Sequence, residues 1–127
     1  MKLKDAVKLL TAERIRQYAQ AHFAGRYTRL DIHFRGQFCY VDAYTEPLFL
    51  NSDWPPAGWP ESREEYLERL RNTPTHLFRL RYLGDDEQWE FACYSYAHER
   101  YEWSVLPTGR SVGTPEEAFH TMAELHL

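Results

Sequence analysis

Two runs of alternating apolar and polar residues meet at Gly36-Gln37 and predict a β-hairpin over residues 29–44. Alternation with a period of two is typical of strands buried on one face, and a Gly-X pair between such runs suits a two-residue type II′ turn. This turn predicts the register of the pair. On the apolar face we expect Phe34 opposite Cys39, Ile32 opposite Val41 and Leu30 opposite Ala43, and on the other face His33 opposite Tyr40 and Asp31 opposite Asp42.

Three amphipathic segments predict helices around this hairpin. Apolar residues recur near helical spacing over residues 3–23, where Thr11 is a candidate cap for a second, kinked segment and Gly25 ends the helix. The other two segments open with capping boxes at Ser62 and Thr114, in which Ser or Thr precedes Glu by three residues. We therefore expect helices after residues 62 and 114.

Three further strands are predicted at residues 76–83, 88–96 and 101–106, joined by short turns. Consecutive strands with short connections favour an antiparallel meander. The order α-β-β-α-β-β-β-α indicates an α+β fold with a mainly antiparallel sheet of about five strands and helices packed on one face. We expect residues 1–127 to form one domain. In the third strand we expect Phe78, Leu80 and Tyr82 to face the helices and Arg79 and Arg81 to face away, whereas the fourth strand is apolar on both sides.

The segment of residues 45–60 is rich in proline yet strongly apolar. We expect it to pack over an edge or face of the sheet. A lid over a ligand and a docking segment for a partner are the alternatives, and both would use Trp54 and Trp59.

Composition narrows the class of function. The 127 residues carry a net charge of -4, which argues against a general nucleic-acid-binding protein, and 16% are aromatic, which indicates a large core or a binding surface. Cys39 and Cys93 lack zinc-ligand spacing, so they are expected to be small buried side chains. The N-terminus does not resemble a signal peptide and no apolar run is long enough to span a membrane, so we expect a cytoplasmic protein.

The facing pair of Asp31 and Asp42 is the most specific chemical signal. Two carboxylates on neighbouring strands repel each other, so something should compensate. The candidates are an arginine such as Arg79 or Arg81, a shared proton, or a bound cation. With His33 between them, the two aspartates are also candidate catalytic residues for acid-base chemistry.

A second set of side chains is expected to bind a partner through the polar face of the sheet. Tyrosine and arginine are favoured at protein interfaces, and they also stack bases and bind phosphates in RNA-binding sheets. No phosphate-binding loop, zinc spacing or hydrolase motif occurs, so the motifs predict neither a cofactor nor a metal. The candidate binding residues are Arg35, Tyr40, Tyr44, Arg79, Arg81, Tyr94, Tyr96, Trp54 and Trp59.

The strings FCYVDAYTEP, SREEYLERLRNTPTHLFRLRY and GTPEEAF together resemble a family of small uncharacterised bacterial proteins, over most of the chain. The resemblance implies a bacterial, cytoplasmic protein and carries no activity, cofactor or catalytic residue. We therefore expect a non-catalytic binding module that engages a protein partner or a second copy of itself. The alternatives are a small hydrolase or nuclease-like enzyme at Asp31, His33 and Asp42, and a single-stranded RNA or nucleotide binder.

Overall fold

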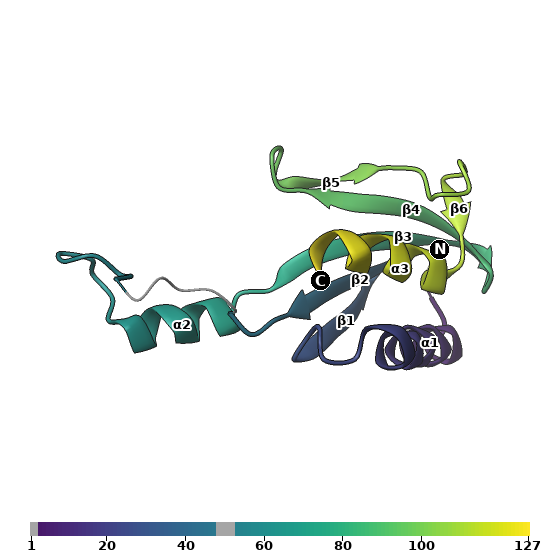
Figure 1. Cartoon of the computed structure of the whole chain (residues 1–127). Coiled ribbons are helices and arrows are strands. Elements are labelled where there is room, and N and C mark those ends of the chain that lie inside the picture. The colour runs from purple at the N-terminus through teal and green to yellow at the C-terminus, as the bar shows by residue number, and fades with distance from the viewer. Residues whose placement is uncertain (1–2, 48–52) are drawn as a thin grey trace.

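The computed structural model describes residues 3–47 and 53–127 and has the predicted α+β architecture (Figure 1). The predicted order is confirmed, with an additional two-residue strand, β6, before the last helix. The elements are α1 (Asp5–Phe23), β1 (Arg29–Arg35), β2 (Phe38–Tyr44), α2 (Arg63–Arg71), β3 (Thr75–Asp85), β4 (Gln88–Ser95), β5 (Arg100–Trp103), β6 (Val112–Gly113) and α3 (Pro115–His126).

The strands form one antiparallel sheet in the order β1-β2-β3-β4-β5. Both β5 and β6 pair with β4, because β5 pairs with its C-terminal half and β6 with its N-terminal half. The predicted strand of residues 101–106 is shorter than expected, since the chain leaves the ladder after Trp103. All neighbouring strands are antiparallel, so the predicted meander is confirmed.

The register of the β1–β2 hairpin agrees with the prediction at every pair, including Asp31 opposite Asp42 and His33 opposite Tyr40. Gly36 has a φ of 62°, a conformation that glycine adopts readily. Glu99 is the only non-glycine residue with positive φ in the described ranges, so Gln37 has negative φ, as a type II′ turn requires.

The helices differ from the prediction at one point. α1 runs without interruption from Asp5 to Phe23, so the expected cap and kink at Thr11 are wrong; Thr11 is instead buried within the helix. The capping boxes at Ser62 and Thr114 are both formed. Within the two described stretches, no helix has the length and apolar character needed to span a membrane.

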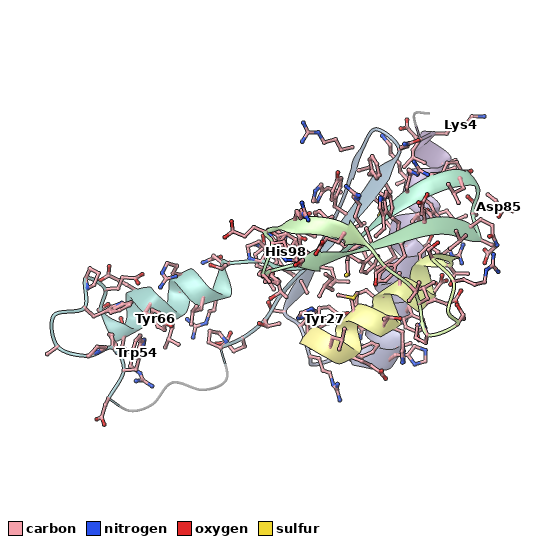
Figure 2. The ribbon with its side chains drawn as sticks, turned by 90° about the horizontal axis from the view of Figure 1, so that it is seen from above. Lys4, Tyr27, Trp54, Tyr66, Asp85 and His98 are labelled. Carbon is pink, nitrogen blue, oxygen red and sulfur yellow. The ribbon has the colours of Figure 1, made fainter. Side chains whose placement is uncertain are left out.

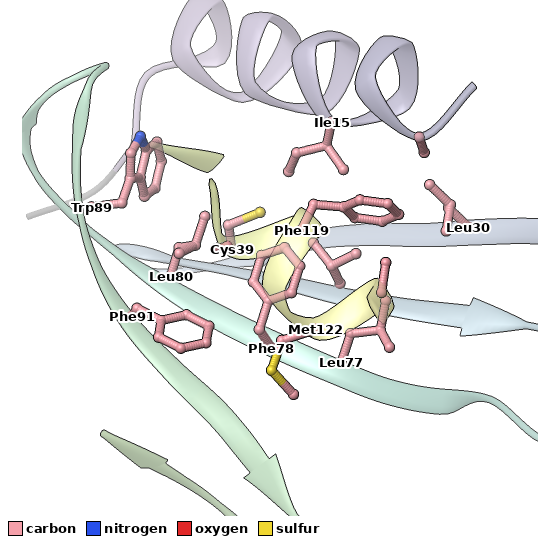
Figure 3. Close-up of a cluster of buried hydrophobic side chains, with 14 of the residues drawn as sticks. Ile15, Leu30, Cys39, Leu77, Phe78, Leu80, Trp89, Phe91, Phe119 and Met122 are labelled. Atoms are coloured by element: carbon pink, nitrogen blue, oxygen red, sulfur yellow. The ribbon is translucent and has the colours of Figure 1, made fainter. Parts of the chain in front are cut away.

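The hydrophobic core lies between the sheet and the two helices α1 and α3 (Figure 3). α1 contributes a narrow stripe of buried residues spaced by four, which includes Ile15 and Phe23. Phe119 of α3 lies at the centre, with its ring in edge contact with Phe23 and Phe78. The narrowness of the stripe on α1 explains why Leu10, which also fits helical spacing, is exposed.

An ion-pair cluster joins α1 to α3 and to the β3–β4 turn. The Arg14 guanidinium donates hydrogen bonds to Glu116 at 2.8 and 2.9 Å and to Glu87 at 2.8 Å. The hydrogen bond to Glu116 raises the pKa of Arg14, with Glu87 contributing in the same direction. Two-pronged pairing of this kind fixes the relative orientation of the two helices.

Residues 53–74 project from the body as an arm that contains α2 (Figure 1). Figure 2 shows Trp54 and Tyr66 far from Tyr27 and His98 of the body. Trp54, Trp59 and Tyr66 pack on one another, with ring centroids 5.1 to 6.3 Å apart. The expectation that the loop packs over the sheet is therefore wrong for residues 53–60, because the rings of Trp54 and Trp59 contact Tyr66 of α2; residues 48–52 lie outside the described residues.

Replacing Phe119 by Ala should lower the free energy of unfolding by about 3–5 kcal/mol, because it removes a fully buried ring from the centre of the core. Urea denaturation followed by circular dichroism measures this change. Leu125→Ala, on the same helix but 71% exposed, is the control and should change the value by less than about 0.5 kcal/mol. Equal losses for the two variants would contradict the described core.

The two capping boxes provide a matched test of whether the arm contributes to global stability. Thr114→Ala should cost about 1 kcal/mol in the free energy of unfolding, since α3 is packed in the core. Ser62→Ala should leave global unfolding unchanged, because α2 has no buried residue. Both values come from the same denaturation experiment, and a comparable loss for Ser62→Ala would show that the arm folds cooperatively with the body.

Candidate functional site

The candidate site lies on the open face, defined as the face of the sheet opposite α1 and α3. Pairing in the sheet places a row of side chains across this face, one from each strand. In strand order the row is His33, Tyr40, Arg79, Ala92 and Trp103. Arg79 and Arg81 face away from the helices, as predicted, and the open face is where most of the candidate residues meet.

At the β1–β2 end of this face, Asp31, His33 and Asp42 come together as the sequence predicted. One ligand atom from each residue lies within 4.8 Å of the others. The Nδ1 atom of His33 lies 3.5 Å from the Asp31 carboxylate, and both side chains are about half exposed. Asp42, in contrast, is 95% buried.

Neither candidate arginine compensates the two aspartates. Arg81 forms an ion pair with Glu90 on the neighbouring strand. Arg79 has no ion pair with a described residue, and its guanidinium lies over the rings of Phe38 and Trp103, 4.6 and 4.9 Å from their centroids. The arginine partner considered for the facing aspartates is therefore not formed.

Asp42 instead contacts His76, a residue that the sequence pattern placed on the other face. The Nδ1 atom of His76 lies 2.9 Å from Oδ1 of Asp42. The reason is a β-bulge, since Val41 pairs with Phe78 but Asp42 pairs with His76. The additional residue, Leu77, is buried beside Phe78, and His76 is turned onto the open face.

Aromatic rings from non-neighbouring strands cover the middle of the open face. Tyr40 of β2 and Tyr101 of β5 have ring centroids 5.4 Å apart, although β3 and β4 lie between their strands. Ala92 of β4, on the same face, is fully buried. Burial raises the pKa of Tyr101, with the nearby Asp42 charge acting in the same direction, so its hydroxyl stays neutral. Phe91 and Ala92, on opposite sides of β4, are both buried.

The tyrosines of β4 extend this layer toward the arm. Tyr94 contacts both Tyr101 and His76, with centroids 5.0 and 4.7 Å apart. The Tyr96 hydroxyl accepts a hydrogen bond of 2.7 Å from the backbone N–H of His76. Tyr96 and Trp103 nevertheless remain 52% and 50% exposed, so the layer presents large rings to solvent at its margins.

Two polar atoms in this layer have no partner. The Nε atoms of Arg79 and Arg81 are buried and form no hydrogen bond within the described part of the chain. Buried donors are usually paired, so an unpaired one calls for an explanation. Here both guanidinium groups lie over the Trp103 ring, 4.9 and 5.5 Å from its centroid. The ring therefore covers one side of each group.

The remaining candidate residues lie apart from this layer. Arg35 is exposed at the end of β1. Tyr44 lies beneath the guanidinium of Arg29, 4.0 Å from the ring centroid. Trp54 and Trp59 are on the arm. The sequence pattern predicted Arg35 and Tyr44 for the sheet face and the Trp54–Trp59 loop as an addition to it. The candidates that the structure brings together in the layer are Tyr40, Arg79, Arg81, Tyr94 and Tyr96.

No protein-family model, curated protein or solved structure matches the chain.

Two hollows of the described surface lie away from the aspartates. One of about 490 Å³ lies between residues 25–28, residues 45–47 and the C-terminus, and another of about 340 Å³ lies where the arm joins the body, beside Tyr96. Neither is lined by Asp31, His33 or Asp42. The aspartate pair therefore lies outside both of these hollows.

A second polar cluster, which the sequence pattern did not reveal, joins α1 to α3. The Tyr18 hydroxyl lies 2.8 Å from Nδ1 of His120, whose Nε2 lies 2.9 Å from Glu124. Burial raises the pKa of Tyr18. The phenol therefore stays protonated and can donate its hydrogen bond to His120, which ties the two helices together.

The His76–Asp42 contact generates a stability prediction. His76→Ala should lower the free energy of unfolding by about 1–3 kcal/mol, because it leaves the buried Asp42 carboxylate without its hydrogen-bond partner. His98→Ala is the matched control, since His98 makes a contact of the same length with Glu102 at an exposed position. It should change the value by less than about 0.5 kcal/mol. Similar losses for His76→Ala and His98→Ala in urea denaturation would contradict the expected stabilisation of the buried Asp42 carboxylate by His76.

Proposed function

We propose that the protein is a non-catalytic protein-binding module that binds a second copy of itself, with the arm of each copy lying on the open face of the other. The observation that carries this proposal is the composition of the open face: half-exposed rings surround an arginine without an acidic partner. Tyrosine, tryptophan and arginine contribute most to binding energy at protein interfaces.

The arm supports a second copy as that occupant. α2 is nine residues long and has no buried residue. Isolated helices of that length are marginal in water, and most of a helix's stability in proteins comes from packing. Trp54, Trp59 and Tyr66 pack on one another at the far end of the arm, and α2 has no buried residue against the body. A surface on another molecule would supply that packing.

Charge complementarity favours the contact between arm and open face. Glu64 is exposed in the first turn of α2 and has no ion pair within the described residues, while Arg79 on the open face has none either. In an arrangement with two-fold symmetry each arm would meet the other copy's open face, so both contacts form together. A bidentate carboxylate-arginine contact is among the stronger polar contacts in proteins.

The alternative functions have less support. For RNA binding, the face carries the acidic residues Asp31, Asp42 and Glu90 beside its arginines, and the chain has a net charge of -4. For an enzyme, the three candidate catalytic residues lie outside the hollows described above.

Sedimentation velocity over a range of concentrations tests the proposal. At high micromolar concentration we expect a species of twice the chain mass of 15.2 kDa. Glu64→Arg, on the exposed arm, should weaken the dimer at least about tenfold, because it places like charges together. Trp103→Ala should weaken it similarly. Arg79→Glu combined with Glu64→Arg should restore the dimer, since the charges are then exchanged.

The control for the charge reversal is Arg110→Glu, which reverses a charge of the opposite sign on the exposed loop between β5 and β6. It should leave the dimer unchanged. A monomer at high micromolar concentration would overturn the proposal, as would a dimer that is insensitive to both Glu64→Arg and Trp103→Ala. Fluorescence anisotropy with a labelled oligouridine probe covers the RNA alternative, and tight, salt-sensitive binding of the probe would count against a protein interface.

A further inference from the structure

The triad of Asp31, His33 and Asp42 supports an inference that goes beyond the proposed function and does not depend on it. Asp31 and His33 alternate along β1 and therefore share the open face, and Asp42 lies directly opposite Asp31 on β2. One ligand atom from each of the three lies within 4.8 Å of the others. The hairpin register thus places two carboxylates and one imidazole around a common point.

The negative charge at this point is not neutralised by arginine. Arg81 is paired with Glu90, and Arg79 lies against aromatic rings farther along the face. Asp31 has His33 as its nearest cationic candidate, at 3.5 Å. Two adjacent carboxylates with only histidines beside them create a site that favours a bound cation.

The burial of Asp42 is a second, independent observation. Its side chain is only 7% exposed, and His76 contacts one of its oxygens, Oδ1. A carboxylate this buried, with the half-exposed His76 as its hydrogen-bond partner, carries a cost in free energy that a metal ion at the triad would offset. His76 would act as a positioning residue, because its contact with Oδ1 orients the Asp42 carboxylate.

We propose that Asp31, His33 and Asp42 bind one divalent transition-metal ion of the Zn²⁺ or Mn²⁺ type. An imidazole nitrogen combined with two carboxylates suits these ions better than Ca²⁺ or Mg²⁺, which prefer oxygen ligands alone. Three protein ligands leave further positions for water. Ligands at about 2.1 Å from the metal lie about 3–4 Å apart, so the half-exposed Asp31 and His33 side chains need only a small adjustment.

Isothermal titration calorimetry of Zn²⁺ and of Mn²⁺ into the full chain without an affinity tag tests the site. We expect one ion bound per chain for at least one of the two metals. Asp31→Asn and His33→Gln should each weaken binding by about 10- to 100-fold or more, as loss of a metal contact does. Both residues are half exposed, so these variants should retain the fold, which circular dichroism checks.

The matched control is the pair of His98 and Glu102, which are in contact at 2.9 Å but have no third ligand beside them. His98→Gln and Glu102→Gln should leave metal binding unchanged. Absence of heat with both metals would overturn the inference, and so would binding that survives Asp31→Asn and His33→Gln. Loss of metal binding in His98→Gln or Glu102→Gln would also overturn the inference. Failure of metal binding leaves the proposed dimer standing, because sedimentation velocity tests the dimer separately and without added metal.

Discussion

The two-residue turn at Gly36-Gln37 is the constraint on which both faces of the sheet depend. Because side chains alternate along a strand, a slip of one residue would exchange every inward position with an outward one. The turn prevents this slip, with Gly36 at a φ of 62°. It directs Cys39 and Val41 into the core, where both are fully buried, and with the same step aligns Asp31 with Asp42 on the open face.

The parts of the molecule that could be predicted are those determined by neighbouring residues. The hairpin register follows from alternation and one turn, and the capping boxes at Ser62 and Thr114 follow from four residues each. His76 could not be placed in this way. Its orientation depends on the bulge opposite Asp42, which accommodates two large apolar side chains, Leu77 and Phe78, in the core.

Contacts between distant parts of the chain were likewise beyond the sequence pattern. The contact between Tyr40 of β2 and Tyr101 of β5 requires knowledge of how the sheet curves, because two strands lie between theirs. The arm shows a related limit. Its prolines and tryptophans indicated a segment that must pack on something, but the pattern could not distinguish the sheet from the helix that follows it. The Trp54 ring packs on Tyr66, the first apolar residue of α2.

On the open face the triad and Arg79 lie on different strands. The distance between them determines how strongly a divalent cation at the triad and an acidic group at Arg79 would affect each other. Tyr40 pairs with His33 on one side and with Arg79 on the other, so the triad and Arg79 lie about two strand spacings, or about 10 Å, apart. That distance is close to the screening length at physiological ionic strength, about 8 Å. The aspartates at the triad repel an acidic group on Arg79, by about 0.4 kcal/mol per charge pair in bulk water and more beneath the rings. A divalent cation at the triad would cancel this repulsion. Because such coupling is reciprocal, an acidic partner on Arg79 would in turn favour the bound cation, so the two ligands would reinforce each other modestly.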